Sequence, residues 1–162
     1  MVSVNVLFVC LGNICRSPTA HGVFEMLVQR AGLSDAITTD SAGTAAWHTG
    51  KSPDPRSAAA AAARGYDLTH LRARQVQPSD FDEFDYVLAM DSQNFAELKA
   101  IQPEGYKGCL ALFLNFADAD ESEVPDPYYG GTQGFEQVLD LVEDAAQGLL
   151  EDIRVRHGVG SQ

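Results

Sequence analysis

The sequence is poor in cysteine and contains no long hydrophobic run. Three cysteines in 162 residues are too few, and odd in number, for a disulfide scaffold, and none forms the Cys-x-x-Cys pair typical of structural zinc. No apolar segment is long enough to span a bilayer, and the first residues lack the basic start and apolar stretch of a signal peptide. We therefore expect a protein of a reducing, cytoplasmic compartment.

Positive charge is also scarce. Eleven Lys and Arg residues stand against 23 Asp and Glu residues, which gives a formal net charge of -12. This balance argues against nucleic acid or an anionic membrane as the main partner. An anion site in this chain would have to obtain its positive potential locally, from backbone N–H groups and a few arginines.

Apolar residues are plentiful, at 45% of the chain. Together with the length, this content predicts one folded domain with a substantial core. We place that domain at residues 1–157 and expect residues 158–162 to form a frayed tail.

Strand-like and helix-like segments alternate along the chain. Apolar and β-branched runs predict strands at residues 2–9, 37–41 and 86–90, with a fourth inside 108–114. Helical periodicity covers residues 18–30, 57–64, 92–101 and a long segment over 135–153, and we expect Ser17 to cap the first helix. The alternation predicts an α/β fold, a three-layer sandwich of a four-stranded parallel sheet with helices on both faces. Ligands of such sheets bind at the carboxyl ends of the strands, where Cys10, Asp91 and the loop carrying Trp47 fall.

A cysteine at the end of the first strand begins the most informative segment, residues 10–17 (CLGNICRS). Backbone N–H groups in a loop that enters a helix bind anions, and the same positive field favours the thiolate of Cys10. Arg16 offers a planar fork for two phosphate oxygens, and Gly12 and Asn13 tolerate the positive φ of a tight loop. Ser17 either caps the helix or donates its hydroxyl to the Cys10 sulfur.

Two motifs give the chain a family resemblance. Residues 9–18 (VCLGNICRSP) and 126–130 (DPYYG) resemble the two signatures of the low-molecular-weight protein tyrosine phosphatases. The likeness continues at residues 40–43, 70–75 and 84–91, and it reaches from the first strand to the last helix. The resemblance implies a flavodoxin-like fold of the phosphotyrosine phosphatase I type.

The resemblance also implies an activity. It implies a hydrolase of phosphotyrosine or other aryl phosphate monoesters that needs neither metal nor cofactor. Cys10 would be the nucleophile that forms a phosphocysteine, Arg16 the phosphate clamp and Asp126 the general acid and base. Pro125 and Pro127 restrict the position of the Asp126 carboxyl, although Asp126 is one acid among several in its loop.

Further residues take supporting parts in this expectation. The phosphate-binding loop includes Leu11, Gly12, Asn13, Ile14, Cys15 and Ser17. By resemblance, Ser41 and His70 help to hold that loop in shape, while Asp91 either orients Arg16 or caps the helix after it. Trp47, Tyr128 and Tyr129 are expected as cleft walls, which would favour aryl phosphates. We assign no catalytic role to His21, His48 or His157.

Regulation and partners follow as hypotheses. Cys15 shares the loop with Cys10, so a disulfide between them would inactivate the enzyme reversibly, although a small buried residue is the alternative. The resemblance suggests that Tyr128 or Tyr129 is phosphorylated. The expected partner is a phosphotyrosine-containing protein, for example a tyrosine kinase, with inorganic phosphate as product. We expect a monomer that self-associates at most weakly.

Three other functions compete with this one. An arsenate reductase can share the fold and loop, but it needs a relay of further cysteines and only Cys109 follows the loop. A phosphoarginine phosphatase typically has Thr where this chain has Ile14. A flavin- or nucleotide-binding module is the third, although the loop lacks the Gly-Lys-Ser/Thr of a nucleoside-triphosphate cradle.

Overall fold

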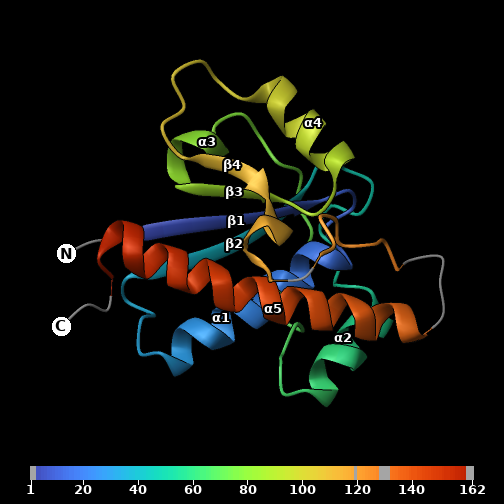
Figure 1. Cartoon of the computed structure of the whole chain (residues 1–162). Coiled ribbons are helices and arrows are strands. Elements are labelled where there is room, and N and C mark those ends of the chain that lie inside the picture. Colours follow the sequence, from blue (N-terminus) through green and yellow to red (C-terminus); the bar gives the residue numbers. More distant parts are fainter. Residues whose placement is uncertain (1–2, 119, 128–131, 160–162) are drawn as a thin grey trace.

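A computed structural model describes residues 3–118, 120–127 and 132–159 of the chain. Its centre is a sheet of four parallel strands in the order β2-β1-β3-β4 (Figure 1). The strands are β1 (Val4–Cys10), β2 (Ile37–Gly43), β3 (Tyr86–Ala89) and β4 (Cys109–Leu112). The predicted α/β fold with one parallel sheet is confirmed.

Helices cover both faces of this sheet (Figure 1). One layer contains α1 (Arg16–Arg30), α2 (Pro55–Ala63) and α5 (Thr132–His157); the other contains α3 (Asp80–Glu83) and α4 (Ser92–Ile101). A 3₁₀ turn, η1 (Phe113–Phe116), follows β4 and packs beside α5. The short α3 was not expected from the sequence, because four residues are too few to show helical periodicity.

The central strand β1 divides its side chains between two cores. Val6 and Phe8 belong to the larger core, shared with α1 and α5, whereas Leu7 and Val9 belong to the smaller core beneath α4. All four side chains are fully buried. This alternation is the period of a strand buried on both faces, and it explains why residues 2–9 form a continuous apolar run.

Helix α1 begins earlier than expected. Its N-cap is Cys15, and Ser17 lies inside the first turn and makes no capping hydrogen bond. The prediction of Ser17 as N-cap is therefore wrong. Pro18 is accommodated because backbone N–H groups in the first helical turn have no partner inside the helix.

The ends of other elements also differ from the prediction. Helix α2 starts at Pro55, two residues before the expected start, because Asp54 caps it through the Arg56 N–H. At the other terminus, the part of the expected tail that the structure describes is not frayed. Gly158 has a φ of 66° and donates its N–H to the Arg154 carbonyl, and Val159 is buried against the larger core.

Candidate active site

The segment between β1 and α1 forms a loop whose carbonyl groups point outward. The Leu11 carbonyl accepts a hydrogen bond from the Ala45 N–H at 3.0 Å, and the Ile14 carbonyl accepts one from the Asp54 N–H at 2.8 Å. Within the described parts of the chain, the Gly12 N–H donates to no acceptor. Amides left over in a tight loop at a helix start form an anion cradle.

A glycine at the end of β2 allows this loop to close. A Cβ atom on Gly43 would lie 2.7 Å from the Leu11 carbonyl oxygen and 3.1 Å from the Asn13 nitrogen. Asn13 is the one non-glycine residue with positive φ in the described ranges, at 58°. Asn tolerates this conformation better than most residues. The loop therefore depends on both residue types.

The sulfur of Cys10 lies at the base of the cradle. It is 3.0 Å from the Ser17 Oγ and accepts a hydrogen bond from the Asn13 N–H at 3.3 Å. The Asn13 Oδ1 accepts from the Arg74 N–H at 3.0 Å, which fixes the amide orientation, and the Asn13 Nδ2 donates to the Ser17 Oγ at 2.8 Å. Because Ser17 accepts from Asn13, its own proton is left for the sulfur at 3.0 Å or for the Ala42 carbonyl at 3.4 Å, and the sulfur is the nearer of the two.

Arg16 is buried and held by groups from two other segments. Its Nη1 donates to the Asp91 Oδ2 at 2.7 Å and to the Val124 carbonyl at 3.0 Å. Its Nη2 lies 3.7 Å from the Asp126 Oδ2. Burial disfavours the charged form of Arg16, but Cys10, Asp91 and Asp126 outweigh it and raise the pKa of Arg16 above its ordinary value. The guanidinium is therefore charged.

Asp91 combines the two roles that the sequence left open. One carboxylate oxygen accepts from Arg16, and the other accepts from the Asn94 N–H at 2.8 Å as the N-cap of α4. The residue that orients the arginine thus also starts the helix after β3.

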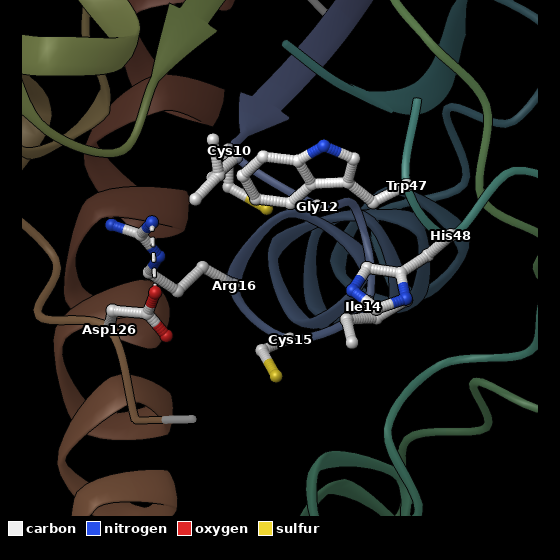
Figure 2. A pocket seen from close by; sticks show the side chains of 9 residues that line it. Cys10, Gly12, Ile14, Cys15, Arg16, Trp47, His48 and Asp126 are labelled. Atoms are coloured by element: carbon white, nitrogen blue, oxygen red, sulfur yellow. Dashed lines mark ion pairs between the residues drawn. The ribbon is translucent and has the colours of Figure 1, made fainter. Parts of the chain in front are cut away.

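These groups surround a cavity of about 150 Å³ (Figure 2). It is lined by Cys10, Leu11, Gly12, Ile14, Cys15, Arg16, Trp47, His48 and Asp126. Trp47 stands at its edge with 72% of its surface exposed. Asp126 lies across from Arg16, and the dashed line in Figure 2 marks their ion pair. The structure therefore brings the expected nucleophile, clamp and acid around one space.

His70 was expected to help hold the loop in shape, but its side chain is half exposed and lies 3.3 Å from Glu25. Among the described residues, no hydrogen bond or ion pair joins His70 to the Cys10 loop. The histidine beside Ser41 is His21, whose Nδ1 lies 3.0 Å from the Ser41 Oγ and whose Nε2 lies 3.6 Å from Glu25. His70 lies in a turn at residues 69–70, and farther along this segment the Arg74 N–H donates to Asn13 of the loop.

Three further residues lie at or near the site without having been expected there from the sequence: His21, His48 and Arg74. His21 could have been found from its spacing, because it lies one helical turn after Ser17. His48 lines the cavity, and a Cβ on Gly12 would lie 2.9 Å from its Cδ2. Its place next to Trp47 was the available signal. Nothing in the sequence indicates that the Arg74 N–H would bind Asn13.

The remaining cysteines differ in their surroundings. Cys15 is buried, and burial raises the pKa of its thiol to about 12, so it is neutral at physiological pH. Cys109 begins β4, at the opposite end of the sheet from Cys10. Tyr128 and Tyr129, the other expected cleft walls, lie outside the described residues.

The described ranges contain neither a candidate metal-binding cluster nor a membrane-spanning helix. No group of three or more His, Cys, Asp and Glu side chains there could hold a metal ion. No helix in those ranges has the length and apolar character needed to cross a membrane.

The fold and the site together define an α/β protein with an anion cradle built around a cysteine. Residues 5–157 match the model of the family described as low molecular weight phosphotyrosine protein phosphatase, and the chain belongs to this family.

Individual relatives agree with this assignment. The low molecular weight phosphotyrosine protein phosphatase of Schizosaccharomyces pombe is 44% identical, over 93% of this chain and 97% of its own. A crystal structure of a protein tyrosine phosphatase from Entamoeba histolytica superposes with a TM-score of 0.90 at 43% identity, covering 96% of this chain and 99% of its own. The crystal structure of a Drosophila arginine phosphatase has a TM-score of 0.86 at 30% identity, covering 92% and 97% of the two chains.

Proposed function

We propose that this protein is a protein-tyrosine phosphatase that hydrolyses aryl phosphate monoesters without a metal ion. The observation that carries this proposal is the position of the Cys10 sulfur. It lies at the base of an amide-lined loop, beside a hydroxyl donor, in the cavity that Arg16 and Asp126 also line. A thiolate there would meet phosphorus while the arginine and the amides bind the phosphate oxygens.

In the first step the Cys10 thiolate attacks phosphorus and the bond to the phenolic oxygen breaks. The leaving oxygen takes the proton of the Asp126 carboxyl, so a neutral phenol departs and a phosphocysteine remains. Arg16 and the loop amides stabilise the negative charge on the equatorial oxygens in the transition state. Because these groups supply the positive charge, the reaction would need no metal.

In the second step water hydrolyses the phosphocysteine. The Asp126 carboxylate takes a proton from the attacking water, the S–P bond breaks, and the Cys10 thiolate and inorganic phosphate are released. The Ser17 hydroxyl, 3.0 Å from the sulfur, would stabilise the thiolate as leaving group. One acid and one thiolate in opposite protonation states predict a bell-shaped dependence of rate on pH.

The cavity supports aryl phosphates as substrates. Trp47 at its edge and the apolar side chains of Leu11 and Ile14 offer contacts to a ring. We propose phosphotyrosine in a protein as the physiological substrate, a tyrosine kinase being one candidate. We also propose a cytoplasmic location, because the reactive thiol requires a reducing setting, and a monomer that self-associates at most weakly.

Phosphoarginine is the alternative that deserves a direct comparison, because one similar structure is that of an arginine phosphatase. Against it, Ile14 lines the cavity and has no hydroxyl to assist. Arsenate reduction is less favoured, since a relay needs further thiols near Cys10. Cys109 lies at the far end of the sheet.

The test is hydrolysis of phosphotyrosine, phosphoserine and phosphoarginine peptides by the purified protein in excess EDTA without thiol reductant. We expect phosphate release from phosphotyrosine only, abolished in Cys10→Ser and retained in Cys109→Ser, which removes a thiol outside the cavity. Activity that requires a reductant or an added metal, or that prefers phosphoarginine, would contradict the proposal.

Cys15 supports a second, regulatory proposal. Peroxide would oxidise the Cys10 thiolate to a sulfenic acid, and attack by the Cys15 sulfur would release water and form a disulfide. The neutral Cys15 thiol must lose its proton in that step. We expect peroxide inactivation to be reversed by dithiothreitol in the wild type but not in Cys15→Ala. Equal recovery in both would refute it.

A further inference from the structure

An acidic residue outside the cavity ties the loop that carries Asp126 to the rest of the molecule. The Glu123 Oε2 accepts a hydrogen bond from the Ser92 N–H at 2.6 Å. Ser92 is the first residue of α4, so the carboxylate meets an amide with no partner inside the helix. This amide holds the pKa of Glu123 below its usual value, which keeps the carboxylate charged. Negative charge is favoured at this end of a helix.

The next residue is fixed in three ways. The Val124 N–H donates to the Met90 carbonyl at 2.7 Å, and the Val124 carbonyl accepts from Arg16 at 3.0 Å. The Val124 side chain is fully buried in the larger core. The backbone is therefore anchored to the end of β3 and to the proposed phosphate clamp.

Two prolines limit the backbone conformations available between Val124 and Asp126. Pro125 has a fixed φ and restricts the backbone of Val124, while Pro127 restricts Asp126 to extended conformations. Few torsions are left free between the anchored Val124 and the Asp126 carboxyl. The direction of that carboxyl thus depends on where residues 123 and 124 are held.

We propose that Glu123 is a positioning residue for the general acid: its bond to the Ser92 N–H holds the loop so that the Asp126 carboxyl faces the leaving oxygen. The inference rests on the proposed function of Asp126. Glu123 itself does not line the cavity and touches no reacting atom.

A matched control lies two residues away. Glu121 is in the same loop, carries the same charge and is exposed. Within the described ranges it forms no hydrogen bond or ion pair. Glu121→Ala therefore changes the loop charge as Glu123→Ala does, without releasing the loop from α4.

The experiment measures kcat/KM for a series of aryl phosphates whose phenols differ in acidity. A poor leaving group needs the proton of Asp126, whereas an activated phenol departs with little help. We expect Glu123→Ala to lower kcat/KM about tenfold for phenyl phosphate and less than about twofold for the most activated ester. Glu123→Gln, which keeps an acceptor for the Ser92 N–H, should recover most of the loss, and Glu121→Ala should resemble the wild type.

The Asp126→Ala background separates the two hypotheses. If Asp126 is the general acid, Asp126→Ala alone steepens the dependence on phenol acidity, and adding Glu123→Ala changes it no further. A wild-type dependence in Asp126→Ala would overturn the proposed function of Asp126. A steeper dependence in Asp126→Ala, together with a uniform loss or no loss in Glu123→Ala, would overturn the role of Glu123 alone.

Discussion

Asp91 offers the sharpest test of how the site is built, because one carboxylate serves two neighbours. One oxygen accepts from the Arg16 guanidinium at 2.7 Å and the other from the Asn94 N–H at 2.8 Å. Asp91→Asn has nearly the same shape, but its amide has a single acceptor oxygen. If the amide oxygen of the substituted side chain caps α4, its NH₂ group faces the Arg16 guanidinium. If the amide oxygen faces Arg16 instead, the cap of α4 is lost.

The size of the effect follows from the bond that is lost. A hydrogen bond between charged groups contributes about 1.5–3 kcal/mol. Asn is as good an N-cap as Asp, so we expect the cap to be kept and the bond to Arg16 to be lost. This corresponds to a fall in kcat/KM of roughly 10- to 100-fold, at about 1.4 kcal/mol per factor of ten. Inhibition by inorganic phosphate should weaken as well, because the proposed phosphate clamp, Arg16, would bind the product too.

The assay is steady-state hydrolysis of an aryl phosphate, with phosphate inhibition and the thermal midpoint measured on the same samples. Glu97→Gln is the control. It removes one negative charge from α4, and among the described residues Glu97 forms no ion pair with Arg16. We expect it to keep wild-type kinetics. If Asp91→Asn lowers the thermal midpoint but leaves kcat/KM and phosphate inhibition unchanged, Asp91 only caps the helix and our reasoning is wrong.

Three further changes test other parts of the structure. Gly43→Ala would place a Cβ 2.7 Å from the Leu11 carbonyl oxygen, and the resulting strain should cost about 1–3 kcal/mol in denaturant unfolding and weaken phosphate binding. If Gly43→Ala keeps the wild-type unfolding free energy and phosphate affinity, the Cys10 loop can shift to accommodate the added Cβ, and the expected strain is absent. Ser17→Ala removes a hydrogen-bond donor to the Cys10 sulfur and should lower kcat/KM roughly 10- to 100-fold. It should also slow alkylation of Cys10 by iodoacetate, and an unchanged alkylation rate would refute the proposed hydrogen bond. Burial and the hydrogen bond to Asp152 raise the pKa of Tyr86 above the usual value of about 10. The protonated Tyr86 hydroxyl therefore stabilises the fold fully below about pH 10, and this stabilisation is lost as the pH rises further. Tyr86→Phe should flatten the decline of unfolding free energy above about pH 10, and an unchanged slope would contradict this.

Much of the fold was predictable because its signals are local. The run of apolar residues before Cys10 predicts a strand buried on both faces, and the alternation with helical periodicity predicts a parallel sheet. Because the strands of such a sheet are parallel, their carboxyl ends lie at one edge, and this brings Cys10, Asp91 and the Trp47 loop to the same edge. The short α3 escaped prediction because it has no periodicity. The true start of α1 was not predicted, because Ser-Pro usually marks the N-cap and first residue of a helix. In this chain the Ser17 hydroxyl lies 3.0 Å from the Cys10 sulfur and does not cap the helix.

The site divides in the same way. The sequence by itself indicated which groups to expect in the site: Cys10 and Arg16 through their spacing between a strand and a helix, and Asp126 through the resemblance of its motif to the family's signature. Only the tertiary structure decided which groups hold them. His21 rather than His70 reaches Ser41, the Arg74 N–H donates to Asn13, and the Glu123 carboxylate accepts from the Ser92 N–H. These contacts join residues 20 to 61 positions apart in the chain. Those of Asn13 and Glu123 are to main-chain amides, which every residue except proline possesses, so no residue pattern marks them.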